Sequence, residues 1–251
     1  TFIVSSIFRR DSIFFRWYGG RFRKALGSFE HIFVQDEGSE NLLEGIGIKN
    51  VSVAGDTRFD RVAEIAGNAK QLPIVEKFAA GGNVFIAGST WPPDEEIVQR
   101  LANDNPDMKF IVAPHEMEIT RITSLIENTR AGAACYTECE AGADCSAKQM
   151  LIIDTIGILS SVYQYGCYAL IGGGFGVGIH NTLEAATFGL PIIFGPNYHK
   201  FKEARELVDI GAAESISGNE DAADWLEHLR SDVSDNELPQ RPVPGRVCNH
   251  N

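Results

Sequence analysis

Apolar residues occur in short continuous runs along most of the chain, and stretches with helical spacing separate these runs. The five clearest runs are NVFIAGS, KFIVAP, MLIID, YALIGG and LPIIFG, at 83–89, 109–114, 150–154, 168–173 and 190–195. Helical patterns separate them at 94–103, 116–129, 157–165 and 180–188. Continuous apolar strands that alternate with helices predict a parallel sheet covered on both faces. The sequence therefore predicts a doubly wound α/β domain, whose ligands bind at the carboxyl ends of the strands.

The first third of the chain carries a shorter version of the same pattern. HIFVQ (31–35) and VSVAG (51–55) are predicted strands, and a helix closed by Gly47 is predicted over 36–46. The polar-to-alanine stretch that ends near Gly82 is interpreted as an interdomain connection. We therefore expect three parts, at 1–75, 76–230 and 231–251, and the last of these has no periodicity and should lack a packed structure.

A glycine-rich run follows one predicted strand and precedes a predicted helix. The run GGGFGVG occupies 172–178, and the helix should begin near His180. Glycines let a backbone approach a ligand closely, and a helix N-terminus favours a phosphate. Asn181 would cap the helix, and Glu184 could accept hydrogen bonds from two ribose hydroxyls. The combination predicts nucleotide binding, with a glycine-rich turn that holds no ligand as the alternative.

The net charge of −12 argues against general nucleic-acid binding, which needs a basic surface. Residues 1–24 depart from this average, because they hold six basic residues, one acidic residue and seven aromatic residues. Such a mixture suits a surface that meets anionic lipid headgroups. From composition alone, a half-buried helix with a solvated basic face is the favoured interpretation. No apolar run reaches the roughly 18 residues that a membrane-spanning helix needs.

The five cysteines are an odd number, which fits a reducing cytoplasm better than a disulfide framework. Cys135, Cys139 and Cys145 lie close together in sequence beside acidic residues, but their spacing matches no common zinc pattern. We interpret this segment as a polar loop with incidental cysteines, and we expect no metal site.

The glycine run begins a longer block that carries a family resemblance. The block GGGFGVGIHNTLEAATFGLPIIFGPNYHKFKEA resembles the signature of 3-deoxy-D-manno-octulosonic acid (Kdo) transferases of lipopolysaccharide synthesis. The segments FVQDEGSENLLEGIGIKNVSVAGDTRFDRV, AGSTWPPDEE and DTIGILSSVYQYG are similar to that family in order and spacing, as is IFRRDSIFFRWYGGRFRKAL near the start. The resemblance covers about residues 2–216.

This resemblance implies an α/β fold of the GT-B type, with two Rossmann-like doubly wound domains, the N-terminal one only partly present. Residues 1–75 would be the C-terminal part of the acceptor domain with a linker, and 76–230 would bind the CMP-sugar. The implied reaction is an inverting transfer of Kdo from CMP-Kdo to a lipid A precursor (lipid IVA), with no metal and no cofactor. The implied location is the cytoplasmic side of the inner membrane of Gram-negative bacteria, with residues 1–24 as a peripheral contact.

The resemblance implies donor-binding roles for ten residues, namely Ser89, Thr90, Pro114, His115, Ile156, Gly157, Gly174, Gly178, Asn181 and Glu184. The loop at 89–90 would lie near the donor phosphate or sugar, and a plain helix cap is an equally good interpretation of it. The loop at 156–157 would line the cytosine pocket with backbone groups. The two glycines and Asn181 would hold the CMP phosphate, and Glu184 would hold the ribose.

Two departures from the family pattern affect these expectations. Many relatives have Pro-Arg-His where this chain has Pro114-His115-Glu116, so an imidazole replaces a guanidinium. His115 is then either a weaker phosphate contact or a structural residue. The family's catalytic acid lies in a Gly-Glu motif early in the N-terminal domain. We expect that acid upstream of Thr1, so the catalytic residue is unknown.

Two other functions are compatible with the same residues. Another GT-B enzyme, such as a UDP-sugar transferase or a 2-epimerase, could share the arrangement of glycine run, helix and glutamate. A truncated nucleotide-binding module without activity could share it too. The base pocket would separate CMP from UDP ligands, because the two nucleotides differ in both base and number of phosphates.

Overall fold

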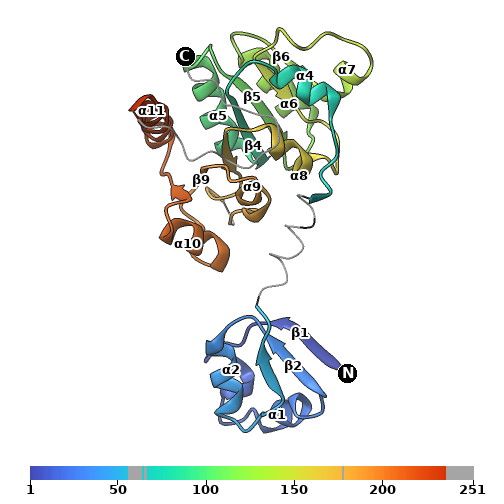
Figure 1. The fold of residues 1–251 in the computed structure, drawn as a ribbon, viewed down its shortest axis with the longest axis vertical. Coiled ribbons are helices and arrows are strands. Elements are labelled where there is room, and N and C mark those ends of the chain that lie inside the picture. The colour runs from blue at the N-terminus through green and yellow to red at the C-terminus, as the bar shows by residue number, and fades with distance from the viewer. Residues whose placement is uncertain (56–63, 65–66, 177, 236–251) are drawn as a thin grey trace. The chain divides into compact units, whose positions relative to one another are not determined.

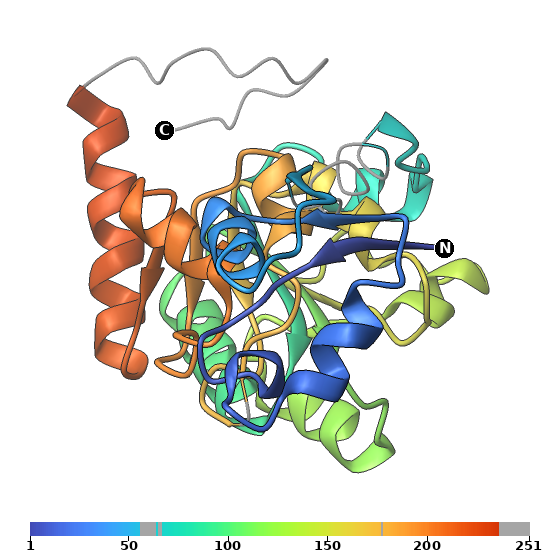
Figure 2. The same ribbon diagram turned by 90° about the horizontal axis from the view of Figure 1, so that it is seen from below.

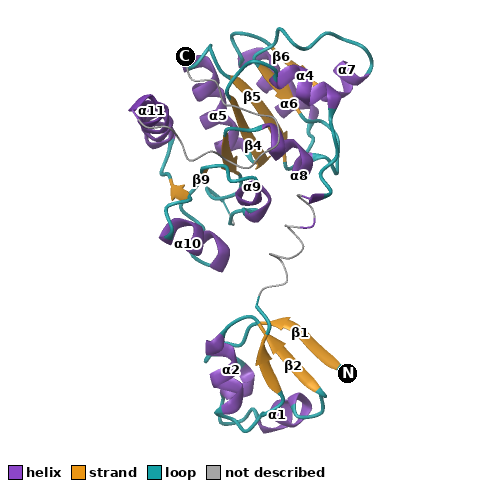
Figure 3. Ribbon diagram, in the orientation of Figure 1, coloured by secondary structure: helices purple, strands orange, loops and turns teal. Residues whose placement is uncertain are grey.

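The structure, a computed structural model, describes residues 1–55, 64, 67–176 and 178–235. The chain forms two compact units, at 1–64 and 65–251. Each unit has its own parallel sheet and its own apolar core (Figures 1 and 3). None of the helices in the described part of the chain is long and apolar enough to cross a membrane.

The first unit is built on a three-stranded parallel sheet. Its elements are β1 (Phe2–Ser6), η1 (Ile13–Phe15), α1 (Gly20–Leu26), β2 (His31–Val34), α2 (Glu37–Glu44) and β3 (Val51–Val53). The strand order is β1-β2-β3. Helix α2 begins after Asp36, whose carboxylate accepts a hydrogen bond from the Ser39 amide at 2.6 Å. The predicted helix over 36–46 and the two predicted strands are confirmed.

The prediction of a half-buried helix within residues 1–24 is wrong for most of that segment. Phe2–Ser6 is a strand that pairs in parallel with His31–Val34, and the helix α1 begins only at Gly20. The strand forms because FIVSS finds a hydrogen-bonding neighbour in β2, which no local pattern reveals. Several aromatic side chains of the segment remain exposed, notably Trp17 at 91% and Tyr18 at 57%.

The second unit is built on a seven-stranded sheet. Its strands are β4 (Val84–Thr90), β5 (Lys109–Pro114), β6 (Ala133–Cys135), β7 (Met150–Ile152), β8 (Tyr168–Ile171), β9 (Ile192–Phe194) and β10 (Ala213–Ser215). Its helices are α4 (Pro73–Ala79), α5 (Pro92–Asp104), α6 (Ile119–Asn128), α7 (Tyr136–Glu140), α8 (Leu159–Val162), η2 (Tyr163–Tyr165), α9 (Leu183–Thr187), α10 (Lys202–Asp209) and α11 (Asn219–Asp235).

The strands of this sheet are all parallel, in the order β10-β9-β8-β4-β5-β7-β6. Both faces are buried, as strand β4 demonstrates. Val84 and Ile86 point into one apolar cluster, whereas Phe85 and Ala87 point into the other. The two clusters are covered by helices, which is why the strands read as continuous apolar runs. The predicted doubly wound α/β domain is confirmed.

Three local expectations need correction. Helix α4 lies in the stretch interpreted as a connection, yet Val75 and Phe78 are buried in the core of the second unit. Helix α11, which is seen along its length in Figure 2, continues past Ser231 to Asp235; residues 236–251 of the predicted tail lie outside the described residues. Cys139 and Cys145 form a disulfide that joins α7 to the following loop, so these cysteines are not incidental.

Candidate functional site

The strand order of the second unit reverses next to β4. Strand β4 pairs with β5 on one side and with β8 on the other, and the chain reaches β8 only after it has formed β5, β6 and β7. In open parallel sheets, ligands bind where the order reverses, at the carboxyl ends of the strands. The loops that follow Thr90 and Ile171 meet at this point and form the centre of the candidate site.

The glycine run after β8 packs tightly against neighbouring strand ends. A Cβ atom at Gly172 would overlap the backbone carbonyl of Ser89, and one at Gly174 would lie 2.5 Å from the amide nitrogen of Gly195. A side chain at either position would therefore push the run away from β4 or β9. These glycines were expected to let the backbone approach a ligand closely, whereas contacts within the protein already require them.

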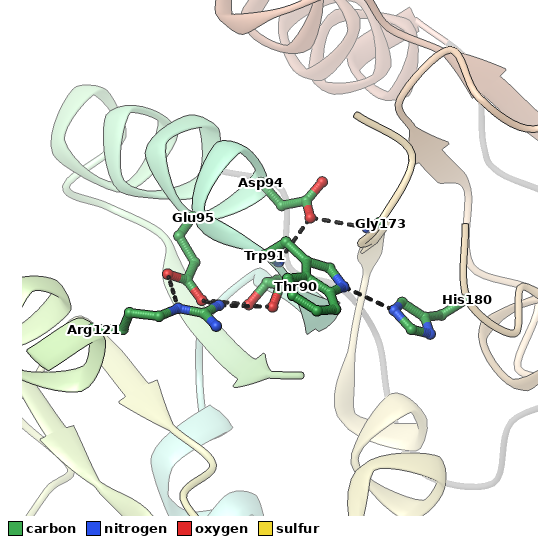
Figure 4. Close-up of polar contacts among 7 residues, drawn as sticks. All are labelled: Thr90, Trp91, Asp94, Glu95, Arg121, Gly173 and His180. Carbon is green, nitrogen blue, oxygen red and sulfur yellow. Dashed lines mark hydrogen bonds and ion pairs between the residues drawn. The ribbon is translucent and has the colours of Figure 1, made fainter. Parts of the chain in front are cut away.

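Asp94, in the first turn of α5, connects that helix to the glycine run (Figure 4). Its Oδ2 accepts hydrogen bonds from the amide of Trp91 at 2.8 Å and from the amide of Gly173 at 2.9 Å. The residue is only 1% exposed, and this burial raises the pKa of its carboxyl group. Sequence reasoning missed this contact, because an acidic residue in a first helical turn is sufficiently explained as a cap.

The other side of the same turn is held by a buried ion pair. Arg121 of α6 donates to Glu95 Oε1 at 2.5 Å and to the carbonyl of Thr90 at 3.0 Å. Thr90 is fully buried, and its hydroxyl donates to Glu95 at 3.1 Å. The Thr90 hydroxyl is therefore engaged inside the protein, whereas the neighbouring Ser89 is half-buried with a left-handed φ of +54°.

Three ring side chains from separate loops stack over this turn. His115, which follows Pro114 at the end of β5, stacks against both Trp91 and His180, with its ring centroid 4.8 and 4.3 Å from theirs. Trp91 Nε1 donates to His180 Nε2 at 3.0 Å (Figure 4). Burial, and then the neighbouring His115, lower the pKa of His180. His115 thus lies in the predicted site, and its neighbours Trp91 and His180 were not foreseen.

Helix α9 is shorter than predicted. It begins at Leu183 rather than near His180, and the Asn181 side chain accepts a hydrogen bond from the Leu183 amide at 3.1 Å. The Asn181 amide group also donates to Glu184 Oε1 at 3.1 Å, so the structure brings these two predicted residues together. Burial raises the pKa of the Glu184 carboxyl group, which the bond from Asn181 opposes.

A buried phenol lies under the same region. A Cβ atom at Gly88 in β4 would overlap the hydroxyl of Tyr163, so the glycine makes room for that ring. Tyr163 is 2% exposed, and burial followed by the charge of Glu184 raises the pKa of its hydroxyl. Glu184, which is half-buried, therefore lies close enough to this phenol to affect its ionisation.

The predicted base-binding loop follows β7, the neighbour of β5 in the sheet. Ile156 is 89% exposed, and Gly157 has a left-handed φ of +88°. Just before this loop, the Asp154 carboxylate accepts the Thr137 amide at 2.9 Å and the Thr137 hydroxyl at 2.5 Å. The start of the loop is thus fixed to α7, while the two predicted contact residues are open to solvent.

Nine of the ten expected donor-site residues belong to strand ends and loops at the carboxyl edge of one sheet, and the tenth, Glu184, lies in the first turn of α9. The loops after β4, β5 and β8 are joined by direct side-chain contacts, whereas no contact of Ile156 with them is found among the described residues. Within the described residues, no group of three or more His, Cys, Asp and Glu side chains is placed to hold a metal ion. The edge combines backbone amides, imidazoles and one half-buried carboxylate, which suits the hydroxyl and base groups of a ligand together with an anion.

The chain is similar to curated proteins that share one description. The chain is 28% identical over 225 residues to a 3-deoxy-D-manno-octulosonic acid transferase from Rickettsia bellii, a match that covers 87% of this chain and 53% of the relative. It is 24% identical over 186 residues to the protein of the same description from Aquifex aeolicus, covering 72% and 48%. The chain spans about half the length of the curated relatives it matches. No family model matches it.

Solved structures share the fold at lower identity. The C-terminal CMP-Kdo binding domain of WaaA from Acinetobacter baumannii aligns with a TM-score of 0.52 at 20% identity, covering 71% of this chain and 90% of that domain. UDP-GlcNAc 2-epimerase from Neisseria meningitidis, solved with UDP-GlcNAc bound, aligns with a TM-score of 0.59 at 15% identity, covering 92% and 61%. The predicted resemblance to Kdo transferases and the predicted α/β fold of GT-B type are confirmed.

Proposed function

We propose that this chain provides the donor-binding domain, and part of the acceptor domain, of a glycosyltransferase that transfers Kdo from CMP-Kdo to a lipid A precursor in lipopolysaccharide synthesis. The observation that carries the proposal is the sequence match to Kdo transferases along 87% of this chain. The fold supports it, because a CMP-Kdo binding domain aligns with 71% of this chain at a TM-score of 0.52. The carboxyl edge of that sheet is then the donor site.

In this proposal, CMP lies across the point where the strand order reverses. The ribose hydroxyls donate to Glu184, which Asn181 holds at 3.1 Å. The phosphate lies over the glycine run at Gly174 and Gly178, within reach of Ser89 and His115. The cytosine lies against the loop at 156–157, whose exposed backbone groups can recognise the base edge.

The reaction that fits this donor is an inverting displacement at the anomeric carbon of Kdo. A hydroxyl oxygen of lipid IVA forms the new bond as the bond from the anomeric carbon to the CMP phosphate oxygen breaks. Preorganised donors at the glycine run stabilise the charge that develops on the phosphate. A carboxylate takes the proton from the attacking hydroxyl, and we assign that role to none of the described residues.

The first unit supports a peripheral contact with the inner membrane. Trp17 and Tyr18 are exposed beside one another, with ring centroids 5.4 Å apart, in a segment rich in arginine. Exposed aromatic rings and basic side chains together suit an anionic lipid surface. Vesicles of anionic lipid should therefore retain the chain in a flotation assay, and the arginines should make this retention weaken as salt rises. Equal retention by neutral vesicles at every salt concentration would contradict the proposal.

Calorimetry with nucleotides tests the donor assignment directly. The chain should bind CMP more tightly than UDP or UMP, and EDTA should leave the CMP affinity unchanged. Tighter or equal binding of UDP would exclude the CMP assignment and favour a UDP-sugar enzyme, the alternative that shares this fold. CMP binding without transfer from CMP-Kdo generated in situ would identify the chain as a donor-binding module.

A further inference from the structure

The indole of Trp91 determines which nitrogen of His180 carries a proton. An indole N–H is only a donor, so the nitrogen 3.0 Å away, Nε2 of His180, must be the acceptor. A neutral imidazole that accepts through Nε2 carries its hydrogen on Nδ1. The ring is thus held in the less usual tautomer by a contact from a different loop.

The ring is also fixed in place by the glycine run itself. The His180 amide donates to the carbonyl of Gly172 at 3.1 Å, and a Cβ atom at Gly173 would lie 3.1 Å from Cδ2 of the ring. His115 covers one face of the ring at 4.3 Å. These contacts leave the imidazole little freedom to rotate, so the direction of its Nδ1–H bond is set by the fold.

The Nδ1–H has no acceptor among the described residues, and it lies on the side of the ring away from Trp91 (Figure 4). The nearby charges are already committed to other partners. Asp94 accepts two backbone amides, and Glu95 pairs with Arg121. A structural histidine would need only the bond to Trp91. The fixed tautomer in addition presents a hydrogen-bond donor on the ring edge opposite to the one that meets Gly173 and Trp91 (Figure 4).

We propose that His180 is a further donor-site residue, whose Nδ1–H donates to an anionic group of the ligand, and that Trp91 positions it by fixing the tautomer. This inference rests on the proposed function for the identity of the ligand. Two groups of CMP-Kdo share the required chemistry, the CMP phosphate and the sugar carboxylate. Their shared property is an oxygen anion, which would accept the Nδ1–H on the ring edge that faces away from Trp91 and Gly173.

Two substitutions of His180 separate a binding role from a structural one. In His180→Asn, the amide nitrogen replaces Nδ1, so the donor remains and the bond to Trp91 is lost. In His180→Gln, the amide oxygen can replace Nε2, so the bond to Trp91 remains and the donor is lost. A binding role predicts that the Gln variant loses about tenfold or more in affinity for the anion, the range for a hydrogen bond to a charged group, while the Asn variant stays within about threefold. If His180 acts only through its bond to Trp91, the Asn variant should lose more affinity for the anion than the Gln variant.

NMR titration of the full chain and both variants with cytidine, CMP and free Kdo identifies the anion. A loss of CMP affinity with unchanged cytidine affinity assigns the phosphate, and a loss of Kdo affinity with unchanged CMP affinity assigns the carboxylate. Wild-type affinities in the Gln variant for all three probes would overturn the proposal. If the wild type prefers UDP, the proposed function fails, but UDP compared with uridine on the same variants still tests His180.

The tautomer itself has a spectroscopic signature. The ¹⁵N shifts of His180 should identify Nε2 as the unprotonated nitrogen in the wild-type chain. Trp91→Phe removes the indole donor and should move the ring towards the Nε2–H tautomer, with a loss of anion affinity in the same direction as His180→Gln. A wild-type ring protonated on Nε2, or a Phe variant with unchanged shifts, would refute the role assigned to Trp91.

Discussion

Replacing Asp94 by asparagine should stabilise the second unit at neutral pH, whereas replacing it by alanine should destabilise it. The two outcomes differ because asparagine retains an oxygen atom that can accept two backbone amides, and alanine does not. Asp94 Oδ2 accepts both the Trp91 and the Gly173 amides, and Oδ1 is buried without a partner among the described residues. Asparagine keeps an oxygen for the two amides and removes the buried charge, which outweighs the cost of placing its NH2 group where Oδ1 has no partner; alanine removes the acceptor.

The cost of Asp94→Ala can be worked out from these contacts. The buried Gly173 amide would lose its acceptor, which costs about 1–3 kcal/mol, and the loss of the cap on the Trp91 amide adds about 1 kcal/mol. The unfolding free energy should therefore fall by about 2–4 kcal/mol. For a unit of this size, that corresponds to a drop of roughly 5–15 °C in melting temperature.

The effect of Asp94→Asn should depend on pH in a defined direction. Burial raises the folded-state pKa of Asp94 above its unfolded value. Its contribution to stability is thus complete below the unfolded pKa of about 3.9 and is lost as pH rises through the folded pKa. The amide does not titrate, so the variant escapes this loss. The unfolding free energy of Asp94→Asn should therefore be close to that of the wild type in acid, and it should exceed the wild-type value increasingly towards neutral pH.

Urea unfolding followed by circular dichroism at several pH values between about 4 and 7.5 measures both variants. Glu96→Gln, an exposed change in the same helical turn, is the matched control and should be near neutral throughout. An Asn variant that becomes less stable than the wild type as pH rises would refute the reasoning, because the carboxylate would then be favoured in the folded state. An Ala variant as stable as the wild type would show that Gly173 finds another acceptor.

Two further predictions concern the glycine run and the helix after it. Glu184→Gln should weaken CMP binding by about 1.5–3 kcal/mol. Only the wild type should lose CMP affinity as pH falls through the raised pKa of Glu184. Calorimetry at several pH values checks both expectations. Gly172→Ala should lower the unfolding free energy by about 1–3 kcal/mol or more, since its Cβ overlaps the Ser89 carbonyl. Gly176→Ala, whose Cβ approaches nothing closer than 3.7 Å, should be much milder, and equal effects would contradict the packing argument.

The apolar runs predicted the central strands of the second unit because burial on both faces leaves a continuous signal. The edge strands β6 and β10 escaped prediction because three residues such as Ala133–Cys135 carry little propensity of their own. Strand β1 was missed for a related reason, since its pairing with β2 is a contact between distant segments. Local pattern therefore locates the core of a sheet better than its margins.

Some residues of the candidate site could likewise be predicted from local sequence, and others could not. The glycine run, Asn181 and Glu184 are neighbours in sequence, and their spacing predicted that they act together. Of these, Asn181 and Glu184 are in contact in the structure. The stack of Trp91, His115 and His180 joins three loops that are far apart in the chain, so no spacing could reveal it. The roles of all these residues towards a ligand stay predictions.

The strand reversal explains why the turn after β4 carries so many polar contacts. Strands β4 and β8 are neighbours, but no single crossover joins them, so chain connectivity does not hold their loops together. Side chains of the turn provide that connection instead. Asp94 and Trp91 reach the glycine run, while Glu95 reaches Arg121 on the side of β5. A substitution that disturbs this turn should therefore alter both halves of the proposed donor site together, even where the substituted residue would touch no ligand.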